Sequence, residues 1–293
     1  MSKLTSPAAI LYLAITLGVA APAIGLQHGE TNTHTQANVH MWADVIALID
    51  TDAREFAVTT VGRNRLLFTR RHSDKTTIYE TRRGDSGSWS KPAPASFAVA
   101  EDADPFFDPY TDTLYYMSRA EHPLKDKGAD DYDIWQVELN GEEWGKAKPL
   151  ENGVNTAAQE VYPTIDKDGT LYFASNRSGG YGGHDIYIAE NSGTGWHAEN
   201  AGPVVNSASS DSNPFIMPDG ETLVFYCNKE TGYGEVDLYR TNGGPGGWST
   251  PVNLGSPINS AQGEYAPSIL DAGTFIYSRG EKLVAVPMNR ILR

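Results

Sequence analysis

The 293-residue sequence contains a single cysteine, Cys227, so it cannot form an internal disulfide bond. Its folded state must therefore be stabilised by a core alone. Only 20% of the residues are charged, the formal net charge is -14, and no basic run offsets the acidic excess. Nucleic acids and anionic lipid surfaces are poor partners for such a chain, and we expect neither as a partner.

Long hydrophobic runs are also lacking. An apolar run from Ala8 to Val19 follows Lys3 and precedes small residues at Ala21 to Ala23. This run is too short for a membrane span, and the order of charge, apolar run and small residues is typical of a cleaved secretory signal. We expect a signal peptide at residues 1–25, a flexible leader at 26–39 and one folded domain at 40–293. No lipoprotein cysteine follows the signal, so we predict a periplasmic or secreted protein with no membrane span after cleavage.

Familiar catalytic motifs are missing as well. The sequence has no Gly-x-Ser-x-Gly, His-Glu-x-x-His or Cys-His arrangement. The glycine-rich loop from Gly179 to Gly183 is not followed by a lysine-serine pair, which argues against a nucleotide site. Two Asp-x-Asp pairs, Asp102/Asp104 and Asp166/Asp168, lack the twelve-residue pattern of a calcium loop. The motifs therefore predict no catalytic residue, no metal site and no cofactor.

Turn-forming residues and a repeat are what the sequence does contain. It has 29 glycines and 17 prolines, which suits an all-β protein. Prolines and tryptophans recur at intervals of roughly 50 to 60 residues, which indicates a repeat architecture. The landmarks are Pro105, Pro163, Pro214 and Pro267, and Trp89, Trp144, Trp196 and Trp248.

Each copy of the repeat contains four short runs with strand character, separated by Gly, Asp, Asn and Pro. Four antiparallel strands in about 50 residues are typical of a propeller blade. The last copy, Glu264 to Arg293, ends one strand short, whereas the segment Trp42 to Ile49 precedes the first copy. We predict an all-β fold, a five-bladed β-propeller of four-stranded antiparallel blades. We expect Trp42 to Ile49 to be an outer strand that completes the C-terminal blade and closes the ring.

The third copy carries a family signature. It runs from Pro163 through the Asp168-Gly169 turn and the Leu171–Phe173 strand to the glycine-rich loop and Asp185–Tyr187. This pattern resembles the TolB-type, WD40-like propeller repeat of bacterial envelope proteins. The resemblance covers residues 42 to 293 and implies the propeller alone, without the N-terminal domain of TolB or an OmpA-type domain. It implies no single activity, because the family includes protein-docking platforms and propellers of no known activity.

An acidic residue stands three positions before the proline, or its equivalent Val58, in every copy. These acids are Glu55, Asp102, Glu160, Asp211 and Glu264. We expect them at one mouth of the central channel, where unpaired carboxylates would raise one another's pKa values. Each copy also has a base at or after its second strand: Arg70, Arg119, Arg177, Lys229 and Arg279. Acids and bases are expected to pair as structural contacts, and the alternative is a ring that binds a divalent cation or a basic peptide.

Two functions are compatible with this pattern. The first is an exported, monomeric scaffold that binds an envelope protein, a peptide or another ligand with its acidic ring. The equivalence of the five acids favours this interpretation, because catalytic acids and bases need different environments. The alternative is a glycan-active hydrolase or lyase with two carboxylates at the propeller axis. Its candidate residues are Asp104 and Glu160. The second copy is six residues longer than the others before its Asp-Ile-Trp triplet, and the stretch that contains this insertion, His122 to Asp131, is a candidate recognition loop.

Overall fold

Four short strands form each of the first four blades, and the fifth blade has three. The first blade comprises β1 (Arg54–Val61), β2 (Arg65–His72), β3 (Lys75–Arg82) and β4 (Ala93–Pro94). The second comprises β5 (Asp102–Asp108), β6 (Thr113–Ser118), β7 (Asp133–Asn140) and β8 (Glu143–Trp144), with β9 (Lys148–Pro149) also paired to β7. The third comprises β10 (Glu160–Ile165), β11 (Leu171–Ser175), β12 (Asp185–Asn191) and β13 (Trp196–Asn200).

The last two blades follow the same order. The fourth comprises β14 (Asp211–Ile216), β15 (Thr222–Cys227), β16 (Asp237–Gly244) and β17 (Gly247–Trp248), with β18 (Val252–Asn253) paired to β16. The fifth comprises β19 (Glu264–Asp271), β20 (Thr274–Arg279) and β21 (Lys282–Pro287), followed by the 3-10 helix η1 (Met288–Arg290). All strand pairs within the blades are antiparallel, as the hairpin-rich sequence predicts.

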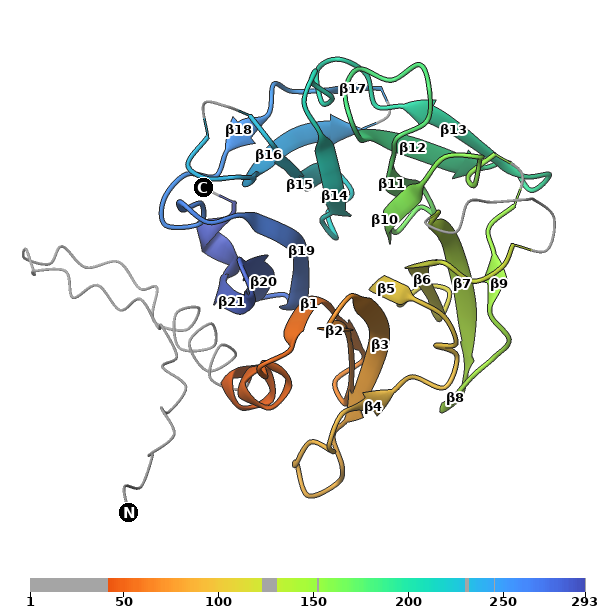
Figure 1. Ribbon diagram of the computed structural model, residues 1–293, viewed down its shortest axis with the longest axis vertical. Coiled ribbons are helices and arrows are strands. Elements are labelled where there is room, and N and C mark those ends of the chain that lie inside the picture. The colour runs from red at the N-terminus through yellow and green to blue at the C-terminus, as the bar shows by residue number, and fades with distance from the viewer. Residues whose placement is uncertain (1–41, 123–130, 152, 230–231, 245, 293) are drawn as a thin grey trace, which may run out of the picture.

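The five sheets stand around one axis, with the first strand of each sheet innermost (Figure 1). The computed structural model describes residues 42–122, 131–151, 153–229, 232–244 and 246–292. Innermost strands contact in the order β1, β5, β10, β14, β19, and β19 contacts β1 again. The prediction of a five-bladed β-propeller is therefore confirmed. The expected signal peptide and leader lie outside the described residues, as does most of the expected recognition loop.

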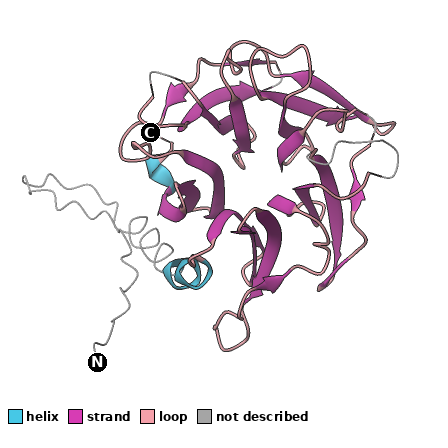
Figure 2. Ribbon diagram, in the orientation of Figure 1, coloured by secondary structure: helices cyan, strands magenta, loops and turns pink. Residues whose placement is uncertain are grey.

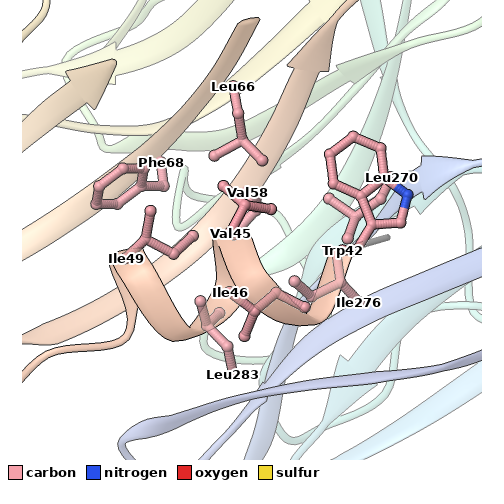
Figure 3. Close-up of a cluster of buried hydrophobic side chains, with 10 residues drawn as sticks. All are labelled: Trp42, Val45, Ile46, Ile49, Val58, Leu66, Phe68, Leu270, Ile276 and Leu283. Atoms are coloured by element: carbon pink, nitrogen blue, oxygen red, sulfur yellow. The ribbon is translucent and has the colours of Figure 1, made fainter. Parts of the chain in front are cut away.

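The ring is closed by a helix where the sequence led us to expect a strand. Residues 42–49 are α-helical, and the fifth blade keeps three strands (Figure 2). Trp42, Val45, Ile46 and Ile49 recur with the i, i+3, i+4, i+7 spacing of an amphipathic helix. All four are buried between the first and last blades (Figure 3), and Trp42 Nε1 donates a 2.7 Å hydrogen bond to Asp271 Oδ2. The segment lies where we predicted, but its hydrophobic period is helical.

The hydrophobic core lies between neighbouring blades. One cluster joins the first and second blades through Leu67, Ile78, Leu114 and Val137, and three further clusters join the following pairs of blades. The remaining pair, the fifth and first blades, is joined by the cluster that contains the helical residues 42–49. Each sheet therefore buries both of its faces, which explains the apolar runs in the strands.

Candidate functional site

The five repeated acids are buried where the innermost strand of each blade begins. These residues are 0 to 1% exposed, so the acids are enclosed in the fold and the alternative of an open binding ring at the channel mouth does not apply to them. Glu160 shows why they are buried: it accepts hydrogen bonds from the backbone and hydroxyl of Thr156, each at 2.7 Å, and from Ser175 Oγ at 2.9 Å. Three other acids accept the same pair of bonds from a Thr or Ser four residues earlier: Glu55, Asp211 and Glu264.

Three of the five expected bases pair with the acid of their own blade. Ion pairs of 2.6, 3.0 and 2.9 Å join Arg70 to Glu55, Arg177 to Glu160 and Arg279 to Glu264. The same guanidinium groups donate to backbone carbonyls of the segment that precedes each blade: Ile49 O, Val154 O and Ile258 O. A buried carboxylate with these partners fixes the entry of the chain into a blade, so these acids are committed to the fold.

The other two bases have different neighbours. Arg119 forms a 2.8 Å ion pair with Glu101 and lies over the ring of Tyr132. Lys229 Nζ lies 4.9 Å from the ring centroid of Tyr239. Asp102 accepts hydrogen bonds from the backbone of Val99 and Ala100. Cation-π contacts are common to all five bases, because Arg70, Arg177 and Arg279 also lie over aromatic rings of their own blades.

The residue two positions after each acid has left-handed backbone geometry. Its φ is 52° at Ala57, 52° at Asp104, 58° at Tyr162, 49° at Asn213 and 50° at Ala266. At each of these sites the pairing register between the first and second strands shifts, which marks a β-bulge. A non-glycine residue in this geometry costs roughly 1 to 3 kcal/mol and is retained where the surrounding structure determines it. The bulge repeats five times and directs one residue of each blade to the axis.

These five bulge residues line a small cavity of about 40 Å³ on the axis. Phe106 from the second blade and Phe215 from the fourth also line the cavity, and their ring centroids are 6.2 Å apart. The second and fourth blades are not neighbours in the ring, so this contact crosses the axis. The opening that the ribbons leave in Figure 1 is thus narrowed by aromatic side chains, and the cavity has room for a few water molecules or one small polar group.

Within the part of the chain that the structure describes, Asp104 is the one acidic residue that lines this cavity. It is 7% exposed, and its Oδ2 atom has no hydrogen-bond partner within the described residues. Burial raises the pKa of Asp104 to about 7, and the positive charges of Arg71 and Arg54 reduce this rise. At neutral pH the carboxyl group is therefore divided between its two protonation states and can either accept or donate a hydrogen bond.

The other bulge residues around the axis are two polar residues, Tyr162 and Asn213, and two alanines, Ala57 and Ala266. Burial, and next the negative charge of Asp104, raise the pKa of the Tyr162 hydroxyl. Asn213 Oδ1 accepts a 2.8 Å hydrogen bond from the backbone of Ala266. Ala57 and Ala266 leave space beside these groups. The five equivalent positions carry four residue types, so the axis is the place where the fivefold repeat loses its symmetry.

Sequence reasoning found Asp104 as an acid of the hydrolase alternative but did not recognise the bulge. The bulge could have been recognised from the residue that precedes the repeated proline. Aspartate and asparagine are the non-glycine residues that tolerate left-handed geometry best, and Asp104 and Asn213 each directly precede a proline. The other hydrolase candidate, Glu160, is enclosed by its partners and does not line the axial cavity.

The repeated aspartates of the glycine-rich loops hold the backbone of those loops. Asp185 accepts hydrogen bonds from the backbone of Tyr181 and Gly182, and Asp237 accepts the equivalent bonds from Tyr233 and Gly234. Cys227 is buried, and burial raises the pKa of its thiol to about 12. No group of three or more potential metal ligands occurs within the described residues. None of the described helices is long and apolar enough to cross a membrane.

The fold places this protein among five-bladed propellers of more than one function. No family model and no curated protein matches the chain. It is similar to the structure of an α-L-arabinofuranosidase from Lactobacillus brevis, with 12% identity, a TM-score of 0.55 and coverage of 80% of this chain and 90% of the other. It is also similar to a TolB-like protein from Agrobacterium tumefaciens, with 14% identity, a TM-score of 0.54 and coverage of 83% and 80%.

A third similar structure is the catalytic domain of an α-L-arabinofuranosidase from Coprinopsis cinerea. Its identity is 11%, its TM-score is 0.54, and the coverage is 81% of this chain and 91% of the other. Identities this low establish the shared propeller architecture alone. The activity of the protein has to be argued from its own residues.

Proposed function

We propose that the protein is an exported, monomeric propeller of the TolB type that acts as a binding scaffold, and that it docks an envelope protein or peptide at the axial site around Asp104. The observation that carries this proposal is the buried, unpartnered Oδ2 atom of Asp104 in the cavity where all five blades meet. A buried polar atom without a partner costs roughly 1 to 3 kcal/mol. A bound donor group would remove that cost, whereas the five repeated acids already have their partners.

The chemistry of the axial site favours a basic group on the partner. A carboxylate in a cavity of about 40 Å³ accommodates one ammonium group from a lysine side chain or a chain terminus. Such a group would hold Asp104 in its ionised form. Because the pKa of Asp104 is raised to about 7 without a ligand, binding would release a proton near neutral pH. Partner affinity should therefore increase as the pH rises from 6 to 8.

Capture of the partner from an envelope extract tests this proposal. The full protein and its Asp104→Asn variant would be immobilised at pH 8. The matched control is Asp112→Asn, because Asp112 also has a positive φ, of 51°, but is exposed in the turn after β5. We expect wild type and D112N to recover the same partner and D104N to lose it. Equal recovery by D104N would count against the axial site as the docking surface.

A glycoside hydrolase is the second candidate, and one observation favours it. A carboxyl group with a pKa of about 7 can act as a general acid at neutral pH, and two of the similar propellers are arabinofuranosidases. Hydrolysis of this kind uses two carboxyl groups roughly 5 to 9.5 Å apart, and Asp104 is the acid among the described lining residues. Release of nitrophenol from a nitrophenyl arabinofuranoside by wild type, and its loss in D104N, would favour the enzyme over the scaffold.

A further inference from the structure

Arginines are concentrated in the first blade although the protein is acidic. Seven of the 13 arginines lie between Arg54 and Arg83, whereas the formal net charge of the chain is -14. Three of the seven line one surface pocket of about 510 Å³, together with side chains that can bind a polar ligand. We call it the arginine pocket, and its described lining residues are Asn64, Arg65, Arg82, Arg83, Gly84, Ser88, Trp89, Ser90 and Glu142.

The pocket lies away from the axial site. Arg65 pairs with Val61 at one end of the β1–β2 hairpin, whereas Arg54 and Arg71, which influence Asp104, pair at the other end. The end of β3 and the segment after it supply most of the lining, and the second blade contributes Glu142 from the turn between β7 and β8. The arginine pocket and the axial cavity share no lining residue.

Glu142 occupies the pocket as a tethered anion. Its Oε2 atom is 2.7 Å from Arg65 Nη2 and 3.3 Å from Arg82 Nη1. Its side chain is nevertheless 75% exposed, so the carboxylate of Glu142 is open to water. Its ion pair with Arg82, whose side chain is 44% exposed, contributes little stability. Arg65 is 4% exposed, so an incoming carboxylate that takes the place of Glu142 has to remake the contact with Arg65.

The arginine beneath Glu142 has donor capacity that its protein partners do not use. The side chain of Arg65 is 4% exposed, and its Nη1 atom has no hydrogen-bond partner within the described residues. Its guanidinium lies 5.4 Å from the ring centroid of Trp144, which fixes its plane. Arg83 is exposed and supplies a third positive charge. A planar guanidinium suits two-point recognition of a carboxylate, although Arg65 Nη1 is itself buried and Arg65 and Arg82 also contact Glu80.

We infer that the arginine pocket binds an acidic saccharide whose carboxylate displaces Glu142 and contacts Arg65 and Arg82. The partly exposed ring of Trp89 offers an apolar face for the sugar ring. Asn64, Ser88 and Ser90 offer hydrogen bonds to its hydroxyl groups. An anion alone would use the arginines, whereas a uronate uses the arginines, the tryptophan and the polar rim together.

Calorimetric titration of the full protein with trigalacturonate tests this inference. Glu142→Gln removes the competing carboxylate and is expected to tighten binding about tenfold, whereas Arg83→Gln should weaken it by a similar factor. The matched control is Glu143→Gln, which makes the same charge change at the neighbouring exposed residue and should stay within about twofold of wild type. Because one variant gains affinity, misfolding cannot explain the pattern.

Two further arms separate the contributions. Neutral trigalactose should show no measurable heat, and inorganic phosphate should bind at least tenfold more weakly than trigalacturonate, since it cannot use Trp89. Equal affinities for phosphate and trigalacturonate would overturn the assignment of a saccharide. Unchanged affinity in E142Q, or no binding by any of the proteins at millimolar trigalacturonate, would overturn the pocket as an anion site.

Discussion

Replacement of Asp104 by asparagine should change stability in a strongly pH-dependent way. The side chain keeps its shape and its tolerance of left-handed geometry but loses its charge. In the folded wild type burial raises the pKa of Asp104 to about 7, against an ordinary value of 3.8 for an aspartate exposed to water. Between these two values the folded state holds a proton that the unfolded state has released. The stability of wild type therefore falls as the pH rises through this window.

The size of the effect follows from the pKa difference. A shift of one pKa unit corresponds to about 1.4 kcal/mol, so the rise from 3.8 to about 7 destabilises wild type by about 4 kcal/mol at pH 8. The amide of D104N avoids this cost. We expect D104N to be more stable than wild type at pH 8 by up to about 4 kcal/mol and nearly equal to it at pH 4.

Urea unfolding of wild type and D104N at pH values from 4 to 8 measures this difference directly. D112N corrects for the loss of one negative charge, because its aspartate is exposed after β5. Groups common to wild type and D104N cancel when their free energies of unfolding are subtracted. A difference that does not change with pH, or a variant that is less stable than wild type at pH 8, would refute the assignment of a buried, unpartnered carboxyl.

Three further substitutions test the architecture by their effect on urea unfolding. Arg177→Gln leaves the buried carboxylate of Glu160 without its cation and should cost about 3 to 5 kcal/mol, and no loss would contradict the structural role of the repeated acids. Gly182→Ala should destabilise the fold strongly, because a Cβ atom at this position would lie 1.8 Å from the backbone carbonyl oxygen of Ser209. The matched control is Gly246→Ala, which should be tolerated because a Cβ atom there meets nothing within 4 Å. Trp42→Ala should cost about 3 to 5 kcal/mol, since the helix closes the ring, and a wild-type transition in this variant would show that closure does not depend on it.

The architecture could be predicted from the sequence because it repeats. The spacing of prolines and tryptophans fixes the number of blades, and the hairpin turns fix four strands per unit. The one error, at Trp42 to Ile49, came from comparing positions between copies. The helical spacing of the apolar residues was present in the sequence and would have corrected it.

The candidate site was only partly predictable. Comparison of copies identified the acids correctly as a set, but it could not show that Glu160 is sealed by Thr156, Ser175 and Arg177. Asp104 lines the cavity because it is itself a bulge residue, and the bulge is a backbone feature. Asp104 differs from its equivalents only when the five bulge residues that line the axial cavity are compared, because it is the acidic one among them.

The proposed binding of a basic partner group by Asp104 is linked to the ionisation of this carboxyl group. Calorimetric titration with the purified partner at pH 7, in two buffers of different ionisation enthalpy, measures the protons released on binding. With a pKa of about 7, wild type should release about half a proton and D104N none. No proton release by wild type, or equal release by D104N, would contradict the binding of a basic partner group by Asp104.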